Sequence, residues 1–444
     1  MSKIVTVIGL GYLGATHAVA MAEFGHTVIG IEPDESKLRA FREGKLPFFE
    51  PGLEESLSKA VKSGNLTFQS AHTESSRNAH AHFICVGTPQ SEGSYAANTT
   101  YVFSAGAELS KWMSPNSVAI GKSTVPVGTA AELKKQMSEV AGFEVDLIWN
   151  PEFLREGTAL NDSLHPDRLV VGGGTPNGIS ILKEVYAPIV KAGTPIVEMD
   201  LQTAELVKTA ANSFLATKIS FINAMAEIAE VSGADTVKLA EAIGLDERIG
   251  KQFLKTGIGF GGGCFPKDIR AFISRAEELG VGDALDFLRD VDAVNLRRRQ
   301  RVVDLLNKEL GTVAEKKIFI LGAAFKPNSD DLRDSPALSV ALKLKALGAN
   351  VFIHDPKAGE GVGKLHPELN VVDNLAEGFS MASAVVLATE WDEYKQIDPE
   401  VSGTLMAQKV VIDGRNVLDV EKWRNAGWKI YALGRSVANE VGGQ

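Results

Sequence analysis

The chain has 444 residues, of which 44% are hydrophobic and 23% charged, and it holds only two cysteines. That length predicts two or three domains, and the composition is typical of a globular protein without a disulfide framework. Lys and Arg number 46 against 56 Asp and Glu, and the net charge of -10 disfavours nucleic acid and anionic membranes as partners. The first residues, MSKIVTVIGL, predict a strand rather than a signal peptide, so we expect a cytoplasmic protein.

Strands and helices alternate from the first residues onward. KIVTVIG predicts a strand, Gly11–Phe24 a helix and HTVIGIE a second strand, which is typical of a parallel sheet. Three later segments, AHFICVGTP, SVAIGKSTVP and VDLIWNPEF, each predict a strand that ends in a polar loop. Because ligands of open parallel sheets bind at the carboxyl ends of strands, we expect the chemistry at these loops.

The pattern changes near residue 202. The segment 202–231 is rich in Ala and lacks Gly and Pro, which predicts one long helix, with shorter helices to about Lys308. KIFILGAAF then predicts a strand, and GANVFIHDP at Gly348 repeats GHTVIGIEP at Gly25. We therefore predict an α/β fold, with two Rossmann-like doubly wound lobes joined by an all-helical segment with a long central helix. The expected domains are residues 1–200, 201–308 and 309–444.

A glycine fingerprint, GLGYLG, follows the first predicted strand. Gly9 permits the tight turn, Gly11 lets a pyrophosphate approach the helix N-terminus, and Gly14 lets helix and strand pack closely. Glu32 ends the second strand, 18 residues after Gly14. A carboxylate there binds the adenosine ribose and repels a 2′-phosphate, so the predicted cofactor is NAD rather than NADP. The second repeat has FKPNSDDLRDSP in place of the fingerprint, so we expect that lobe to hold a different group.

A cysteine stands at the end of a second glycine-rich stretch, GIGFGGGCFPKD, which begins at Gly257. Such a loop lets its backbone approach a ligand closely, and Lys267 and Asp268 offer a cation and a general base, so Cys264 is a candidate nucleophile. A thiolate together with NAD suggests two oxidations, in which an aldehyde is captured as a thiohemiacetal and leaves as an acid through a thioester. For Cys85, inside the strand HFICV, a buried structural role is the preferred interpretation.

Ordered motifs along nearly the whole chain resemble the UDP-glucose/GDP-mannose dehydrogenase family. They are GLGYLG, PFFEPGLEE at Pro47, VGTP at Val86, KSTVPVGT at Lys122, NPEFLREGTA at Asn150, LVKTAANSFLATKISFINA at Leu206, GFGGGCFPKD at Gly259, FKPNSDDLRDSPAL at Phe325 and IDGRN at Ile412. The resemblance implies a four-electron oxidation of a nucleotide-sugar C6 alcohol to a uronic acid with two NAD. It also implies a homodimer or higher homo-oligomer and no metal.

The resemblance implies roles for individual residues. The implied catalytic residues are Cys264 as nucleophile, Asp268 as the acid that activates it or water, Lys208 and Asn212 as the oxyanion-stabilising pair, and Thr124 and Glu152 as a water-holding pair. The implied NAD contacts are Gly9, Gly11, Tyr12, Leu13, Gly14, Glu32, Lys37, Thr88, Thr124, Glu156, Lys267 and Arg333. The implied substrate contacts are Glu152, Phe153, Leu154, Lys208, Asn212, Arg248 from across a dimer contact, Phe253, Leu254, Lys255, Gly257, Gly261 and Lys326.

Without the resemblance, three of these residues would be assigned ordinary roles. Lys208 would be a solvated helix charge, although its spacing of four from Asn212 places both on one helix face. Thr124 would be a turn or cap hydroxyl, and Glu152 a surface carboxylate.

The sequence also departs from the family pattern at a few positions. Gly263 stands where relatives usually have Ser, which removes a hydroxyl beside the nucleophile. Asn98 and Thr99 replace a usual acidic-Leu pair, for which we expect only a changed loop.

Phe265 after the nucleophile favours UDP-glucose as the substrate, because GDP-mannose enzymes tend to have Leu there. GDP-mannose and UDP-N-acetylhexosamines remain alternatives, since one or two pocket contacts decide between sugars. A two-electron dehydrogenase of the hydroxyacid type is disfavoured by the cysteine loop and the second lobe. A non-catalytic nucleotide-sugar binder is disfavoured by the set of candidate catalytic residues.

Overall fold

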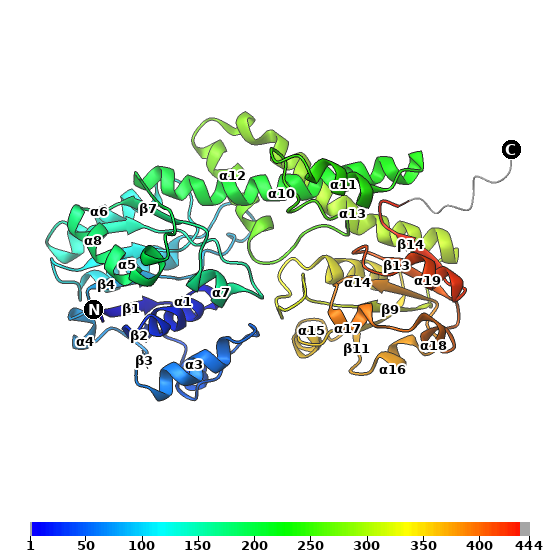
Figure 1. Cartoon of the computed structure of the whole chain (residues 1–444), viewed down its shortest axis with the longest axis horizontal. Helices are drawn as coiled ribbons and strands as arrows, with labels where there is room; N and C mark the ends of the chain where they lie inside the picture. Colours follow the sequence, from blue (N-terminus) through cyan, green and yellow to red (C-terminus); the bar gives the residue numbers. More distant parts are fainter. Residues whose placement is uncertain (1, 436–444) are drawn as a thin grey trace. The chain divides into compact units, whose positions relative to one another are not determined.

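The structure is a computed structural model that describes residues 2–435. The chain divides into two compact units, the first made of residues up to Ala211 with Arg270–Gly282, and the second of Asn212–Ile269 with the residues from Asp283 onward. Each unit holds one sheet that is wholly or mainly parallel and is covered by helices (Figure 1). The predicted α/β class with two Rossmann-like lobes is therefore confirmed.

The sheet of the first unit has the strand order β3-β2-β1-β4-β5-β6-β7-β8. Its strands are β1 (Ile4–Ile8), β2 (Thr27–Ile31), β3 (Leu66–Gln69), β4 (Ala81–Ile84), β5 (Val118–Gly121), β6 (Asp146–Trp149), β7 (Leu169–Gly173) and β8 (Ile196–Met199). Neighbouring strands are parallel except β6 and β7. The central strands β4 and β5 are buried along their whole length, as expected for parallel strands with both faces covered.

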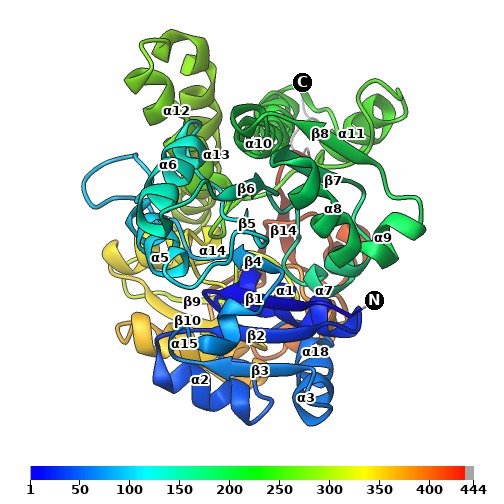
Figure 2. The ribbon, with the colours of Figure 1, turned by 90° about the vertical axis from the view of Figure 1, so that its left-hand side faces the viewer.

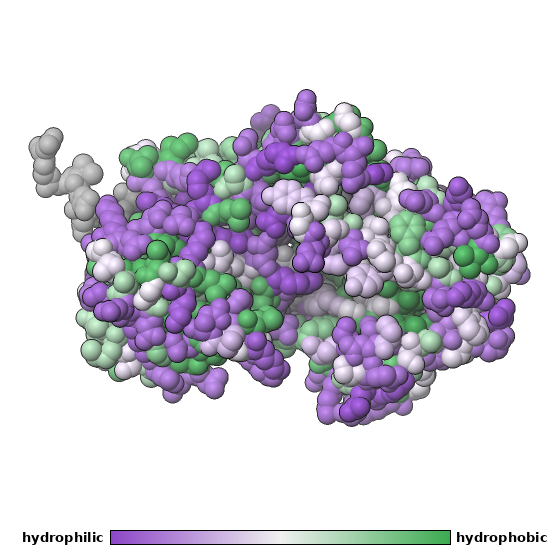
Figure 3. Space-filling model, turned by 180° about the vertical axis from the view of Figure 1, so that it is seen from behind, coloured by the Kyte–Doolittle hydropathy of each residue, from purple (hydrophilic) through white to green (hydrophobic). Residues whose placement is uncertain are grey.

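Helices cover both faces of this sheet. They are α1 (Tyr12–Glu23), α2 (Glu35–Arg42), α3 (Leu53–Lys62), α4 (Glu74–Arg77), α5 (Thr100–Ser110), α6 (Thr129–Ala141), α7 (Ala159–Leu164), α8 (Pro176–Val185) and α9 (Ala187–Lys191). In Figure 2, α1, α3 and α8 lie on one side of the sheet and α5 and α6 on the other. One apolar cluster includes residues of α1, α3 and α8, and another includes residues of α5 and α6. Polar residues cover much of the surface seen in Figure 3, and apolar residues form small separate groups there.

The predicted long helix is present as α10 (Leu201–Ser232), within one residue of the expected ends. The helices α11 (Thr236–Gly244) and α12 (Phe265–Glu278) and the short 3₁₀ helix η1 (Gly282–Leu285) follow. The expectation of shorter helices after α10 is confirmed, and the longest of them, α13 (Asp286–Leu310), runs for 25 residues without Gly or Pro. Within the second unit its arginines pair with acids of α10, for example Arg298 with Glu230 at 3.2 Å. Among the described residues, no helix is long and apolar enough to span a bilayer.

The sheet of the second unit is parallel throughout, in the order β11-β10-β9-β12-β13-β14, which repeats the first six positions of the other sheet. Its strands are β9 (Lys317–Leu321), β10 (Asn350–His354), β11 (Asn370–Val371), β12 (Ala384–Leu387), β13 (Val410–Asp413) and β14 (Lys429–Ala432). Its helices are α14 (Pro336–Ala346), α15 (Gly359–Leu365), α16 (Leu375–Phe379), α17 (Asp392–Lys395), α18 (Pro399–Gly403) and α19 (Val420–Asn425). The internal repeat in the sequence thus corresponds to two copies of one topology.

Candidate active site

The glycine fingerprint forms a tight turn between β1 and α1. Gly9 has a φ of +83°, and a Cβ on Gly14 would lie 1.8 Å from the carbonyl oxygen of Gly9, so neither position accepts a side chain. A Cβ on Gly11 would meet nothing within 4 Å. Gly11 precedes α1, and no side chain caps the first backbone N–H groups of that helix. This cradle fits the pyrophosphate of NAD.

Glu32 lies directly after β2, beside this turn, and is 7% exposed. Its Oε2 accepts a hydrogen bond from the backbone N–H of Leu10 at 3.0 Å, and its Oε1 accepts one from Asp34 at 3.2 Å. Each carboxylate oxygen therefore has one protein donor and retains a lone pair for a ribose hydroxyl. The residues present fit an adenosine ribose without a 2′-phosphate.

The other expected NAD residues of the first unit lie on separate segments. Tyr12 and Leu13 begin α1, and the Tyr12 hydroxyl donates to Glu50. Lys37 lies in the first turn of α2. Thr88 follows β4, and its hydroxyl donates to the carbonyl oxygen of Thr124 at 2.8 Å, which ties the loops after β4 and β5 together. Glu156 lies in the loop before α7.

The equivalent acid of the second repeat, Asp355, has a different environment. Its Oδ2 accepts from the backbone N–H groups of Ala323 and Ala324 at 2.7 and 2.9 Å and from the Trp391 indole at 3.2 Å. Its Oδ1 accepts two further backbone N–H groups. Because protein donors already occupy both oxygens, this carboxylate stabilises its own loop, which agrees with the expectation that this lobe does not hold NAD in the usual way.

Lys208 and Glu152 form a buried ion pair in the first unit. Lys208 Nζ lies 3.2 Å from Glu152 Oε1, and the two side chains are 5% and 12% exposed. Lys208 Nζ also lies 5.3 Å from the centre of the Phe153 ring. Neither of the ordinary roles holds, since Lys208 is not a solvated helix charge and Glu152 is not a surface carboxylate. The expected water-holding partner, Thr124, lies in the half-buried loop after β5.

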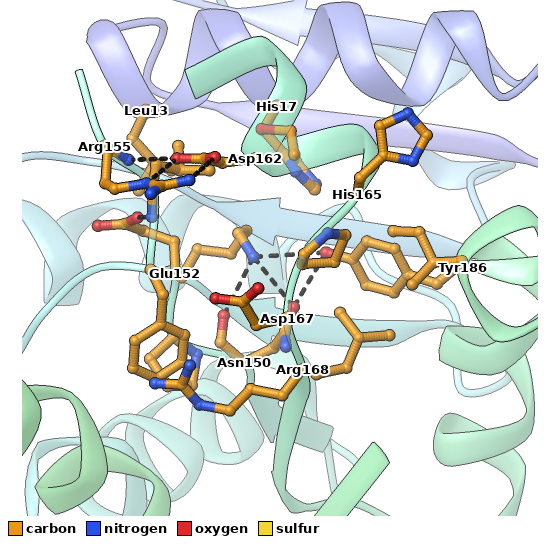
Figure 4. A pocket seen from close by; sticks show the side chains of 18 of the residues that line it. Leu13, His17, Asn150, Glu152, Arg155, Asp162, His165, Asp167, Arg168 and Tyr186 are labelled. Carbon is orange, nitrogen blue, oxygen red and sulfur yellow. Dashed lines mark hydrogen bonds and ion pairs between the residues drawn. The ribbon is translucent and has the colours of Figure 1, made fainter. Parts of the chain in front are cut away.

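A pocket of about 230 Å³ lies in the first unit, between α1, the ends of β5 and β6 and the segment that follows β6 (Figure 4). The expected substrate residues Glu152, Phe153 and Leu154 line it. Arg155 holds this segment to Asp162 with two parallel hydrogen bonds of 2.9 and 2.6 Å, which Figure 4 shows as dashed lines. Paired bonds of this kind fix orientation, so the expected substrate loop is pre-formed.

Cys264 immediately precedes α12 in the second unit and is exposed. Its carbonyl oxygen accepts the N–H of Asp268 at 2.9 Å, which is the first helical hydrogen bond. The positive end of the helix dipole therefore favours the thiolate. Cys85 is buried, and burial raises the pKa of its thiol to about 12, as expected for a structural cysteine.

Asp268 is 2% exposed and has a donor on each carboxylate oxygen. Asn212 Nδ2 donates to its Oδ2 at 2.7 Å, and Lys267 Nζ donates to its Oδ1 at 2.6 Å. Two of the predicted catalytic residues and one predicted NAD residue are thus in direct contact within this unit.

The departure at Gly263 has a steric explanation. A Cβ at this position would lie 2.2 Å from Cζ of Arg333, whose guanidinium is held by Asp331 at 2.7 Å. The backbone N–H of Gly263 also donates to Asp331 at 3.3 Å. A serine would therefore displace the expected NAD residue Arg333 from the position that it takes here.

The expected substrate residues of the second unit lie in two places. Phe253 has a φ of +64°, Leu254 is buried and Lys255 exposed, and Gly257 donates its N–H to Asn223 at 2.9 Å. Gly261 packs against the carbonyl oxygen of Asp334, and Lys326 follows β9, with its Nζ 5.2 Å from the centre of the Phe325 ring. Arg248 is different, because its exposed side chain pairs with Asp246 of its own loop and contacts none of these residues.

Several residues inside the quoted motifs have structural roles that sequence reasoning did not assign. Arg415 of IDGRN donates to the carbonyl oxygens of Ala388, Gly259 and Phe325 at 2.7, 3.1 and 3.2 Å, which fixes the cysteine loop. Lys122 and Asn150 head two further motifs and are hydrogen-bonded to each other. The only sign of these roles in the sequence was that the three residues lie within the motifs.

Known proteins match nearly the whole chain. Residues 3–190, 202–297 and 319–420 match the NAD binding, central and UDP binding domains of the UDP-glucose/GDP-mannose dehydrogenase family. The chain is 38% identical to the UDP-glucose 6-dehydrogenase TuaD of Bacillus subtilis, over 98% of this chain and 93% of that protein. It is 37% identical to the UDP-glucose 6-dehydrogenase of Rhizobium meliloti, over 97% and 99% of the two chains. A solved UDP-glucose dehydrogenase from Pyrobaculum islandicum superposes with a TM-score of 0.90 at 37% identity, over 98% of both chains.

Proposed function

The chain belongs to the UDP-glucose/GDP-mannose dehydrogenase family, and from that premise we propose that it oxidises the C6 alcohol of UDP-glucose to the carboxylate of UDP-glucuronate, using two NAD. The observation that carries the proposal is the thiol of Cys264 at the N-terminus of α12, in a unit where Asn212, Asp268 and Lys267 form one hydrogen-bonded group. A two-electron dehydrogenase needs no such nucleophile.

NAD, when bound, accepts the hydride that leaves C6 of the sugar in each of the two oxidations. In the first step the alcohol loses a hydride and a proton and becomes an aldehyde. The Cys264 thiolate adds to that aldehyde and forms a C–S bond, which gives a thiohemiacetal. Loss of a second hydride and a proton gives a thioester, and water cleaves the C–S bond, releasing the carboxylate and restoring the thiol.

The other proposed catalytic residues stabilise charge and transfer protons. We assign Lys208 and Asn212, one turn apart on α10, to the oxygen on C6 as negative charge develops there. Asp268, which the hydrogen bonds from Asn212 and Lys267 orient, acts as a base toward the thiol or water. Thr124 and Glu152 hold the water that hydrolyses the thioester.

We propose the three domains 1–200, 201–308 and 309–444, and residues of all three contribute to binding. For NAD they are Gly9, Gly11, Tyr12, Leu13, Gly14, Glu32, Lys37, Thr88, Thr124, Glu156, Lys267 and Arg333. For UDP-glucose they are Glu152, Phe153, Leu154, Lys208, Asn212, Arg248, Phe253, Leu254, Lys255, Gly257, Gly261 and Lys326. The chain has a net charge of -10, so it needs local basic groups to bind an anionic substrate. The basic residues of this set would pair with the two phosphate groups of UDP-glucose.

We further propose a cytoplasmic homodimer that forms through α10. Three apolar side chains on this helix, Phe214, Phe221 and Ile228, recur every seven residues and are 67%, 50% and 57% exposed. An apolar stripe with this period is typical of helix pairing. Arg248, which pairs with Asp246 of its own loop, would then serve the neighbouring subunit.

The function is tested by NADH formation with UDP-glucose, GDP-mannose and UDP-N-acetylhexosamines at limiting substrate. The proposal predicts turnover with UDP-glucose and two NADH for each molecule consumed. Preferential turnover of another sugar nucleotide would reassign the substrate, and turnover of none would support a non-catalytic binder.

A further inference from the structure

A lysine ammonium is buried at the carboxyl end of the first unit's sheet. Lys122 follows β5 and is 6% exposed. Its Nζ donates to the backbone oxygen and the Oδ1 of Asn150 at 3.2 and 3.0 Å, and to the hydroxyl of Tyr186 at 3.3 Å. The three protons of the ammonium thus meet three acceptors, all of them uncharged. None of these three acceptors is a carboxylate, which is unusual for a buried cation.

The same network joins the ends of four strands. The backbone N–H of Lys122 donates to Ile84 of β4 at 2.9 Å, and that of Asn150 donates to Gly121 of β5 at 2.8 Å. Asn150 Nδ2 donates to Val170 of β7 at 2.7 Å. Tyr186 completes the group by donating to Asn150 Oδ1 at 2.9 Å. The Lys122–Asn150 contact is therefore the centre of a fully bonded cluster.

This cluster has a fixed relation to the proposed water-holding pair. The register pairs Gly121 of β5 with Trp149 of β6, so Lys122 and Asn150 are the next residues on the two strands. Thr124 follows Lys122 by two residues, and Glu152 follows Asn150 by two. The hydrogen bonds that fix Lys122 and Asn150 therefore limit the positions of Thr124 and Glu152.

We propose that Lys122 is a positioning residue that sets Thr124 and Glu152 for the water that hydrolyses the Cys264 thioester, and that this role needs its positive charge. The inference rests on the proposed function and adds a residue to it. The hydride steps do not consume that water, so the largest effect of the role is expected on acyl release.

Charge is part of this role, and not only hydrogen bonding. Burial is the main cause that lowers the pKa of Lys122 to about 8; the charge of Lys208 acts in the same direction, and Cys85 and Glu152 act against it. His17 and Tyr186 also face this group, and burial lowers the pKa of His17 well below its ordinary value and raises that of Tyr186. Lys122 is thus protonated below about pH 8 and loses its charge as the pH rises through that value.

The test compares K122M, which keeps the length but no donor, with K122Q, which keeps a donor but no charge. Each variant is mixed rapidly with NAD and UDP-glucose, and NADH formation is followed by absorbance. Samples are quenched in acid, and the mass of the Cys264 peptide is measured by mass spectrometry to detect the thioester. K183M is the matched control, because Lys183 is a half-exposed lysine of the same unit, paired with Glu198. If K122M does not fold, Y186F removes one acceptor of the ammonium and should give a smaller effect of the same kind.

In K122M the thioester should accumulate and its hydrolysis should slow by about tenfold to a hundredfold, as expected for a displaced reacting group. The NADH burst and the KM for UDP-glucose should stay within about twofold of wild type. The ratio of wild-type to K122M hydrolysis rates should fall as the pH rises through about 8, and K122Q should show the same change. Unchanged hydrolysis, or hydride steps and hydrolysis slowed alike, would overturn the proposal. A failure of the proposed function would give a different result from a failure of this proposal, because the wild-type protein itself would then form fewer than two NADH and no thioester.

Discussion

Asn212 Nδ2 donates a hydrogen bond of 2.7 Å to Asp268 Oδ2, which joins α10 to the first turn of α12, immediately after Cys264. The bond links two residues 56 positions apart in the chain. Asp268 takes a second bond of 2.6 Å from Lys267. The proposed oxyanion donor and the proposed base are therefore oriented by each other, and a change in one alters both.

Replacing Asn212 by Ala should lower kcat by roughly a hundredfold, which is the usual cost of losing one preorganised oxyanion donor. N212D should be at least as damaging, because it places a second carboxylate against Asp268 and repels it. Steady-state kinetics with UDP-glucose checks both, with NADH binding measured by fluorescence as the control for folding. Near-normal kcat in N212A would remove this residue from the mechanism.

Replacing Cys264 by Ser should abolish the overall oxidation, by roughly a thousandfold or more, because removal of a catalytic nucleophile is among the most damaging changes. NAD affinity should stay at the wild-type value, since the fingerprint turn and Glu32 belong to the other unit. The matched variant C85S tests for a general need for thiols, because Cys85 is buried inside the first unit. Wild-type turnover by C264S would contradict the thiol mechanism.

Replacing Glu32 by Ala should weaken the preference for NAD over NADP. The carboxylate is placed by Leu10 and Asp34 and would repel a 2′-phosphate, so its loss should raise kcat/KM for NADP relative to NAD, by about tenfold. Kinetics with both cofactors at saturating UDP-glucose measures the ratio. An unchanged ratio would show that selectivity resides elsewhere.

The stability of the first unit should depend on the protonation of Glu205. This buried residue of α10 accepts the N–H groups of Gly128 and Ala130 at 2.7 and 2.6 Å at the start of α6, and burial raises its pKa from 4.5 to about 7. The folded state therefore binds more protons than the unfolded state between these values. The free energy of unfolding should fall as the pH rises from about 4.5 through about 7, by at most roughly 1.4 kcal/mol for each pH unit.

The check for Glu205 is the unfolding midpoint of wild type and E205Q between pH 4 and 8. As the pH rises, the unfolding midpoint of wild type should fall relative to that of E205Q. E144Q is the control, because Glu144 is an exposed acid that pairs with Lys134 of α6, and its pKa is lowered. A difference between wild type and E205Q that stays constant over this range would show that Glu205 titrates normally.

Much of the fold was predictable because its signals are local. The strands and the long helix follow from apolar runs and from the absence of Gly and Pro, and the repeat of GHTVIGIEP predicted the second Rossmann-like lobe. The burial of Arg298 and Arg299 in the RRRQR stretch of α13 was not predictable, because the sequence alone does not show which groups these arginines meet. Arg298, for example, pairs with Glu230 of α10, a partner that sequence spacing does not reveal.

The candidate site was predictable where chemistry requires rare residue patterns. The GLGYLG turn and the glycine-rich loop before Cys264 could be interpreted from the residues alone. The environment of Lys208 could not, because its burial depends on Glu152, 56 residues earlier in the chain. The contact of Gly263 with Arg333 and the cluster around Lys122 are likewise long-range packing, which a single sequence does not encode in any local pattern.

The central claim is that one chain carries UDP-glucose through two oxidations by way of Cys264. Its most direct test is the number of NADH formed for each UDP-glucose consumed by the wild-type protein at limiting substrate and excess NAD. The account predicts two NADH and UDP-glucuronate as the product. One NADH, with a free aldehyde as the product, would contradict it.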